Sequence, residues 1–303
     1  MNKFNKGLIA AAYTSFAKNL SVNHQLVKSQ LDYLLATGVK GVLVAGTTGE
    51  GYSLTNQERK SLTETWKSLT PEGFSLMVHV GHHAYGEVND LALHARQIGV
   101  DGILLSTPCY LRPTTVQDLI RFLRLSLTGV EGVPVYYYHI PSLTGVNFLM
   151  ADFLKAADGV LPDLRGIKFT HENLDDFRQC LQYSQYEMIF GRDELLLDAF
   201  QLGAQAALGS TYNFIAPLFN SLVYAHENGQ TDIARRLQQQ AVQIIEVMVK
   251  FGGGVVAGKA MMQIAGVDCG PLRPPLASLD NIQMKQLEQA LQQTRFFEYI
   301  KAE

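Results

Sequence analysis

Short apolar runs rich in β-branched residues alternate with segments of helical periodicity along most of this chain of 303 residues. The runs lack polar–apolar alternation, which is typical of parallel strands whose two faces are both covered. The expected strands are 8–13, 41–45, 74–80, 102–106, 135–140, 166–169, 188–190 and 206–210. The helical segments that follow them are 22–36, 56–69, 87–98, 114–127, 148–157, 174–183, 194–202 and 217–227. This α/β alternation predicts a closed (β/α)8 TIM barrel.

A weak internal repeat supports this count. Gly38-Val39-Lys40-Gly41 and Gly99-Val100-Asp101-Gly102 are nearly the same phrase, and Gly203-Ala204-Gln205-Ala206 is a looser copy. In each phrase the first glycine is suited to end a helix in the left-handed conformation, just before a strand begins. The rival architecture, an open doubly wound sheet, favours a Gly-x-Gly-x-x-Gly turn near the first strand, and the sequence has none there.

After Asn228-Gly229 the pattern changes to helices alone, expected at about 231–251, 256–264 and 279–299. Apolar residues recur at helical spacing in the first and last of them. We therefore divide the chain into a barrel, residues 1–228, and a C-terminal helical extension packed on it, residues 229–303. Core packing or subunit contact is the expected role of this extension.

Composition limits the partners. Hydrophobic residues make up 47% of the chain and charged residues 17%, and the formal net charge is −3. This balance gives no electrostatic reason to expect a nucleic acid or an anionic membrane, so a small molecule is the expected ligand. Cys109, Cys180 and Cys269 are too scattered for a disulfide framework or a zinc site, which fits a reducing, cytoplasmic compartment. We find neither a signal peptide pattern nor a membrane-spanning run.

One lysine is placed for covalent chemistry. In Gly166-Ile167-Lys168-Phe169-Thr170, Lys168 lies in an expected strand between apolar neighbours. Burial removes the hydration that an ammonium needs, so part of this group should be a free amine, a nucleophile toward ketones. The alternative is a lysine whose head reaches solvent or a salt bridge, which is the commoner fate of lysines.

Polar residues follow several other strands, where a barrel carries its catalytic groups. Thr47 and Thr48 lie in a glycine-rich turn whose amides and hydroxyls suit a carboxylate. Tyr110 lies in a loop after an expected strand, and its phenol serves either in packing or in the site. Tyr138 lies on the strand face that also carries Tyr136. The acidic pair Asp193 and Glu194 follows another strand, with helix capping by Asp193 as the alternative, and the hydroxyl of Ser210 lies at the expected rim.

The histidines suggest no metal. His79, His82 and His83 form a cluster, but no carboxylate or cysteine lies at ligand spacing nearby. We interpret His139 and His171 as packing residues or as residues behind the site. The sequence therefore predicts a site without metal.

Taken together, the phrases Gly46-Thr47-Thr48-Gly49-Glu50, Tyr138-His139-Ile140-Pro141, Gly166-Ile167-Lys168, Gly191-Arg192-Asp193-Glu194 and Gly209-Ser210-Thr211-Tyr212-Asn213 resemble the pyruvate-dependent class I aldolases. This family includes dihydrodipicolinate synthase and N-acetylneuraminate lyase. The resemblance runs from about Lys6 to the C-terminal helices, and the Tyr-Tyr-Tyr-His-Ile-Pro strand is most similar to the lyase branch.

The resemblance implies a (β/α)8 barrel with a C-terminal helical extension, assembled as a homotetramer, and roles for individual residues. Lys168 becomes the Schiff-base lysine and Tyr138 the proton-transfer phenol, while Thr47 and Thr48 bind the substrate carboxylate. Tyr110 joins Thr47 and Tyr138 in a hydroxyl relay that can reach into a neighbouring subunit's site. The residues implied to bind the polyhydroxylated tail of the sugar acid are Gly191, Asp193, Glu194 and Ser210. Thr170 is implied to lie near the aldehyde end.

The implied activity is reversible cleavage of N-acetylneuraminate, a sialic acid, to pyruvate and N-acetylmannosamine, with a covalent imine on Lys168 and no cofactor. Two alternatives stay open: another pyruvate-dependent aldolase or synthase of the family, such as a 2-keto-3-deoxy sugar acid aldolase or dihydrodipicolinate synthase, and a non-catalytic barrel that binds a sugar acid. The chain departs from the family's common pattern in having His139 in place of asparagine. It also has Leu143 where the synthases usually carry an arginine.

Overall fold

The computed structural model describes residues 7–300, and its centre is a closed barrel of parallel strands in sequence order, β1 to β8. The predicted (β/α)8 fold is confirmed. The strands are β1 (Gly7–Ala11), β2 (Gly41–Val44), β3 (Ser75–His79), β4 (Gly102–Leu105), β5 (Val135–His139), β6 (Leu164–Phe169), β7 (Glu187–Phe190) and β8 (Ala206–Gly209).

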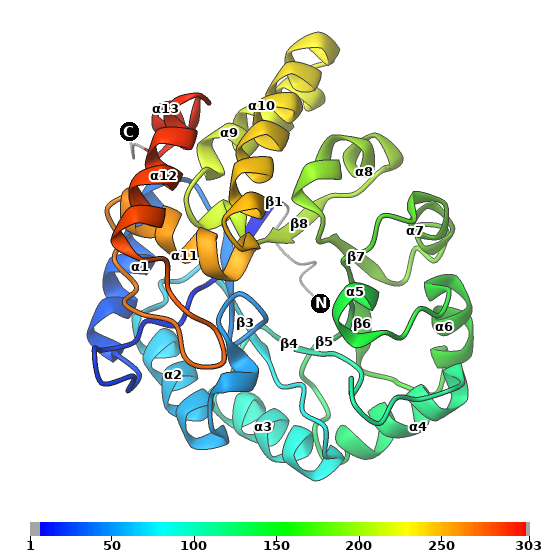
Figure 1. Ribbon diagram of the computed structural model, residues 1–303. Helices are drawn as coiled ribbons and strands as arrows, with labels where there is room; N and C mark the ends of the chain where they lie inside the picture. Colours follow the sequence, from blue (N-terminus) through cyan, green and yellow to red (C-terminus); the bar gives the residue numbers. More distant parts are fainter. Residues whose placement is uncertain (1–6, 301–303) are drawn as a thin grey trace.

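Helices surround the barrel, as Figure 1 shows from one end. The helices up to the last strand are α1 (Val27–Ala36), α2 (Asn56–Leu69), α3 (Tyr85–Ile98), α4 (Val116–Ser126), α5 (Pro141–Thr144), α6 (Met150–Ala157), α7 (Leu174–Cys180) and α8 (Leu196–Leu202). Those after it are α9 (Ala216–Glu227), α10 (Thr231–Lys250), α11 (Gly253–Ile264), α12 (Asn281–Gln292) and α13 (Phe296–Tyr299). Within residues 7–300, the element order is completed by four short 3-10 turns: η1 (His24–Leu26), η2 (Gly51–Ser53), η3 (Asp193–Leu195) and η4 (Thr211–Asn213).

Most helix boundaries differ from the predicted ones by a few residues, and three differences are larger or change the number of helices. The first helix was expected from residue 22 but begins at Val27, because the 3-10 turn η1 precedes it. The helix expected at 279–299 is divided into α12 and α13, and the Thr294 hydroxyl between them bonds back to the Leu291 carbonyl. Helix α5 was not predicted; proline stands at its first position and Gly145, with a φ of 66°, ends it.

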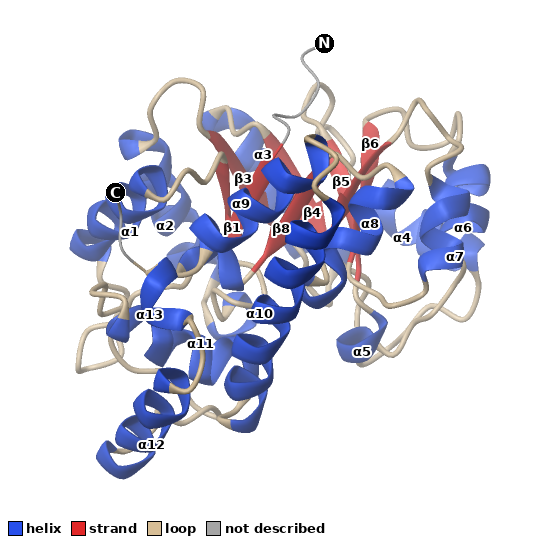
Figure 2. Ribbon diagram, turned by 90° about the horizontal axis from the view of Figure 1, so that it is seen from above, coloured by secondary structure: helices blue, strands red, loops and turns tan. Residues whose placement is uncertain are grey.

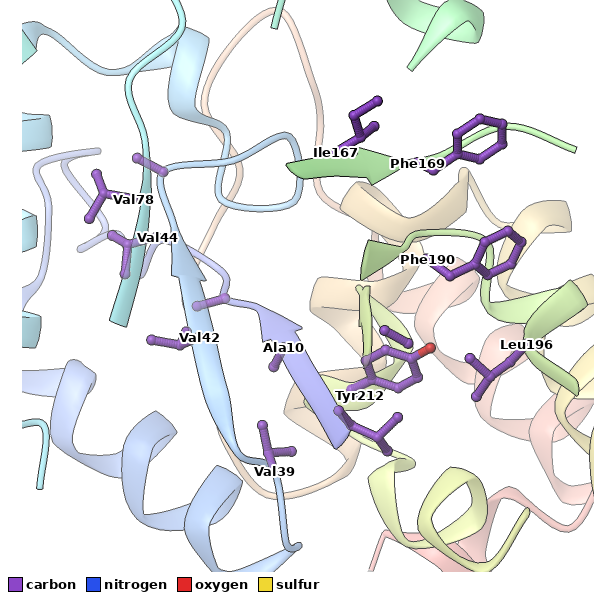
Figure 3. Close-up of a cluster of buried hydrophobic side chains, with 14 of the residues drawn as sticks. Ala10, Val39, Val42, Val44, Val78, Ile167, Phe169, Phe190, Leu196 and Tyr212 are labelled. Carbon is purple, nitrogen blue, oxygen red and sulfur yellow. The ribbon is translucent and has the colours of Figure 1, made fainter. Parts of the chain in front are cut away.

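The apolar core has two parts. Inside the barrel, the side chains of Ile9, Ala11, Leu43, Met77, Leu104, Tyr136, Ile189, Ala206 and Leu208 form one buried cluster. A larger cluster fills the layer between strands and helices, and Figure 3 shows part of it around Val42, Phe169 and Tyr212. Ile244 and Leu287 of the extension belong to this larger cluster, so the extension shares its core with the barrel. The boundary expected after residue 228 stays a prediction.

The extension lies over one end of the barrel. Figure 2 shows α10, α11 and α12 at the same end as α5, which directly follows the C-terminal end of β5. Within residues 7–300 no single helix is long and apolar enough to cross a membrane. Helices α10 and α11 reach the necessary length and apolar composition only when they are taken together, and the chain bends by 104° between them.

Candidate active site

A cavity of about 280 Å³ opens where the strands end and the extension covers them. Nine of the residues proposed from the sequence line it: Thr47, Thr48, Tyr138, Lys168, Thr170, Gly191, Asp193, Glu194 and Ser210. They come from five different strand ends, yet they surround one space. The barrel therefore brings together residues that are far apart in the sequence.

Lys168 and Tyr138 face each other at the base of this cavity. They are register partners on the paired strands β6 and β5, and the lysine Nζ lies 4.0 Å from the centre of the phenol ring. Both side chains are buried, with 4% and 3% of their surfaces exposed. Gly191 leaves room for Lys168 and Thr170, because a Cβ there would lie 3.3 Å from Lys168 Cε and 2.1 Å from Thr170 Oγ1. An amine and a phenol in this arrangement are suited to imine formation and proton transfer.

The turn that carries Thr47 and Thr48, here called the threonine turn, is held by hydrogen bonds from Thr14 and Lys259. The Thr14 hydroxyl donates to the Gly49 carbonyl over 2.6 Å. Glu50, a non-glycine residue in the left-handed region with a φ of 53°, is buried and accepts a hydrogen bond from Lys259 Nζ on α11 at 2.9 Å. The extension thus fixes the backbone that carries Thr47 and Thr48.

Asp193 and Glu194, which follow β7, have two different environments. Asp193 is buried and accepts hydrogen bonds from the Thr211 amide and hydroxyl, at 3.1 and 2.6 Å, rather than capping the helix that follows. Burial raises the pKa of this carboxyl, and the hydrogen bonds from Thr211 oppose that shift. Glu194 is partly exposed and forms an ion pair of 2.8 Å with Arg192. The helix-capping alternative for Asp193 is therefore wrong.

Tyr110 does not join the other candidates within this chain. It lies in the loop after β4, 84% exposed, beside the equally exposed Leu111, and does not line the cavity. Its place in the hydroxyl relay stays a prediction that concerns an assembly.

Sequence reasoning missed the contribution of the extension, to which we assigned packing or subunit contact. Ile245, Met248 and Val249 of α10, with Gly254 and Val255 of α11, line the same cavity. Gly254 lies close to the rim, because a Cβ there would be 2.9 Å from Ser210 Oγ. The run Gly252-Gly253-Gly254 between two helical patterns was the available signal, since glycines often mark a close approach of the backbone.

A second cavity, of about 240 Å³, shares Thr47 and Tyr138 with the first. His79, Ser106 and Leu143 are among the other residues around it. The ring of His79 packs against the phenol ring of Tyr138. Among residues 7–300, no group of three or more His, Cys, Asp or Glu side chains could hold a metal ion.

His139 packs on the outer face of β5, between Tyr137, Phe169 and His171. Burial, followed by the nearby His171, lowers the pKa of His139 to about 3. The imidazole is therefore neutral at physiological pH, as expected of a packing residue.

Comparisons with known proteins agree with the barrel fold and identify the family. The model of the dihydrodipicolinate synthetase family matches residues 4–294. The N-acetylneuraminate lyase of Xenopus tropicalis is 38% identical over 277 residues, covering 90% of this chain and 91% of the relative, and that of Homo sapiens is 38% identical, covering 89% and 87%. The solved structure of Proteus mirabilis N-acetylneuraminate lyase superposes with a TM-score of 0.93 at 35% identity, covering 97% of this chain and all of that one. The chain therefore belongs to the dihydrodipicolinate synthetase family.

Proposed function

We propose that this protein is a Schiff-base aldolase, a carbon–carbon lyase that cleaves N-acetylneuraminate reversibly to pyruvate and N-acetylmannosamine. The observation that carries the proposal is the buried amine of Lys168, 4.0 Å from the centre of the Tyr138 ring, in a cavity that Thr47, Thr48, Asp193, Glu194 and Ser210 also line. The similarity to proteins named N-acetylneuraminate lyase, over about nine-tenths of the chain, supports the choice of substrate.

The chemistry begins when the Lys168 amine attacks the C2 ketone of the open-chain sugar acid, and loss of water gives an iminium. Tyr138 takes the proton of the C4 hydroxyl while its own phenol proton passes to the substrate carboxylate held at Thr47 and Thr48. The C3–C4 bond breaks, and the electron pair of that bond passes into the iminium to form an enamine. N-acetylmannosamine leaves as the aldehyde. Tyr138 returns the proton to C3 of the enamine, and hydrolysis of the imine frees pyruvate and the lysine. These steps use no cofactor.

Two groups of residues hold the substrate in this scheme. The hydroxyls and amides of Thr47 and Thr48 bind the carboxylate, and this turn is fixed by the buried pair of Glu50 and Lys259. Across the same cavity, acidic and hydroxyl groups suit a polyhydroxylated tail, with Thr170 near the aldehyde end. The proposed tail-binding residues are Gly191, Asp193, Glu194 and Ser210.

We further propose a cytoplasmic homotetramer in which Tyr110 completes the hydroxyl relay of a neighbouring subunit. The support is the resemblance to the family together with the exposure of Tyr110, which leaves its phenol available to another chain.

The test is a pyruvate-release assay on a panel of sialic acids and other 2-keto-3-deoxy acids, run beside condensation of pyruvate with aspartate semialdehyde. We expect cleavage of N-acetylneuraminate and no comparable condensation. The side chain of Leu143, on α5 beside the second cavity, is apolar and cannot bind the carboxylate of a second substrate as an arginine would. Efficient condensation without sialic acid cleavage would show a synthase instead.

The covalent step has its own test. Incubation with pyruvate and borohydride, followed by peptide mapping, should place the adduct on Lys168, and Lys168→Met should abolish it. Lys259, the other buried lysine among residues 7–300, is paired with Glu50 and should stay unlabelled. Label on another lysine contradicts the assignment. Trapping without turnover on any substrate of the panel favours a barrel that only binds.

A further inference from the structure

His79 is a buried histidine that the proposed chemistry does not use. It is the last residue of β3, two positions after Met77 of the barrel interior, so its ring points into the barrel lumen. There the His79 ring lies between two phenols. Its centroid is 6.0 Å from that of Tyr138, at an interplanar angle of 88°, and 5.8 Å from that of Tyr52.

A buried guanidinium fixes the His79 ring. Arg59 of α2 is 2% exposed and makes no ion pair with a carboxylate in the described part of the chain. It donates to the carbonyls of His79 and Gly81, and its Nη2 lies 3.4 Å from His79 Nδ1. Because a guanidinium only donates, Nδ1 must accept, and the ring proton lies on Nε2. That Nε2 is 3.3 Å from the Ser106 hydroxyl, which in turn is 3.3 Å from the Tyr52 hydroxyl.

The backbone at Gly81 passes close to this ring. A Cβ at Gly81 would lie 2.7 Å from both Cε1 and Nε2 of His79. Gly81 is not among the glycines with a positive φ, so a left-handed backbone does not account for the glycine here. The glycine is needed here because the imidazole occupies the position of a side chain.

We propose that His79, locked by Arg59, Gly81 and Ser106, is a positioning residue that holds the ring of Tyr138 against Lys168 for proton transfer. The inference rests on the proposed function. Lys168 lies over the face of the phenol, and His79 packs against the same ring nearly perpendicular to it. Since the phenol must reach the C4 hydroxyl and later C3 of the enamine, a rotation or shift of its ring lengthens both proton transfers.

The test is a double-mutant cycle with two readouts. The first is kcat and KM for N-acetylneuraminate cleavage, and the second is the exchange of pyruvate methyl protons in D₂O, followed by NMR, which needs only the imine, the enamine and the phenol. We expect His79→Ala to lower both rates by about tenfold to a hundredfold, the effect of a misplacement near 1 Å, with KM for the sugar acid and borohydride trapping on Lys168 little changed.

In a Tyr138→Phe background the same His79→Ala change should have no further effect on either rate, because the phenol hydroxyl it positions is gone. Equal losses in both backgrounds would overturn the inference. A rise in KM with kcat unchanged would also overturn it, since that pattern indicates substrate binding. His94→Ala, which removes a histidine paired with Glu64 on the outer helices, is the matched control and should leave both rates unchanged.

Gly81→Ala keeps every polar side chain, and it replaces His79→Ala as the test variant if His79→Ala does not fold. Its methyl should displace the imidazole and lower both rates, and the loss should disappear in the Tyr138→Phe background. A Gly81→Ala variant with wild-type rates contradicts the inference.

The exchange readout separates this inference from the proposed substrate. If the wild-type protein exchanges pyruvate protons but cleaves no sialic acid, the proposed function fails and the His79 cycle still decides the inference. If it does neither and traps no pyruvate, both proposals fail.

Discussion

At the scale of single residues, some polar groups buried around the strand ends are paired within the fold, such as Asp193 with Thr211 and Arg59 with two carbonyls. His139 differs, because neither of its ring nitrogens has a hydrogen-bond partner among residues 7–300. A neutral imidazole is tolerated there, but a protonated one would be a buried cation against aromatic rings.

We expect acid to destabilise the protein through His139. Its pKa is about 3 in the folded protein, against an ordinary value of 6.5, so only the unfolded chain takes up this proton as the pH falls below 6.5. The free energy of unfolding should therefore fall between pH 6.5 and 3, by about 2 kcal/mol from this group at pH 5. His139→Asn, which does not titrate, should reduce that fall in urea denaturation at pH 7 and pH 5. An unchanged pH dependence in the variant would contradict the prediction.

Glu194 tests the proposed division between chemistry and recognition. It is partly exposed, pairs with Arg192, and comes from β7 rather than from the strands that carry the amine and the phenol. Glu194→Gln should change the ratio of kcat/KM between sialic acids with different tails by about tenfold, an effect of 1–2 kcal/mol, and leave borohydride trapping with pyruvate intact. Loss of trapping in this variant would place Glu194 in the chemistry instead.

At the scale of elements, the C-terminal extension does more than cover the core. Lys259 of α11 reaches Glu50 in the threonine turn, and both side chains are almost fully buried. The Arg273 amide also donates to Glu50, over 2.9 Å. A helical segment that was expected only to pack therefore holds the backbone on which the proposed carboxylate-binding residues stand.

Breaking this pair should be costly. Lys259→Met leaves the Glu50 carboxylate buried without its cation, and should lower the free energy of unfolding by about 3–5 kcal/mol. The KM for pyruvate should rise as the turn loosens. Adding Glu50→Gln should recover part of the lost stability, since the uncompensated charge is then removed. Urea denaturation measures both effects.

The control for the Lys259 variants is a surface ion pair. Lys60→Met breaks the pair with Asp90 and should cost less than about 1 kcal/mol. A cost as small for Lys259→Met would show that the Glu50–Lys259 pair does not hold the turn.

At the scale of the whole molecule, the sequence was enough to predict the barrel, because eight apolar strands with intervening helices leave few other ways to bury both faces of a sheet. The period of two also placed Tyr138 on the same face of its strand as Tyr136, and the structure shows that this face points into the lumen, next to Lys168. The lining from Met248, Gly254 and Val255 was not predictable, since it depends on how α10 and α11 bend over the barrel. Likewise, the place of His79 against Tyr138 depends on a contact across the lumen, which strand periodicity does not encode.

Tyr110 carries the last prediction, which belongs to the assembly. Its phenol is 84% exposed and lies outside the cavity that holds Lys168, so within one chain it does not reach the proposed site. We expect a tetramer by light scattering, and a loss of kcat of about 10²-fold or more in Tyr110→Phe, since general acid–base groups contribute on this scale.

Mixing two inactive variants, Lys168→Met and Tyr110→Phe, decides whether Tyr110 acts in the site of a neighbouring subunit. Lys168→Met supplies an intact Tyr110 and Tyr110→Phe supplies an intact Lys168, so neither protein alone has a complete site. Hybrid tetramers, formed by dissociating and reassembling equal amounts, should regain about one quarter of wild-type activity, because a random pairing places both intact residues at one site in that proportion. If the hybrids stay as inactive as the parent variants, Tyr110 does not complete a neighbour's site.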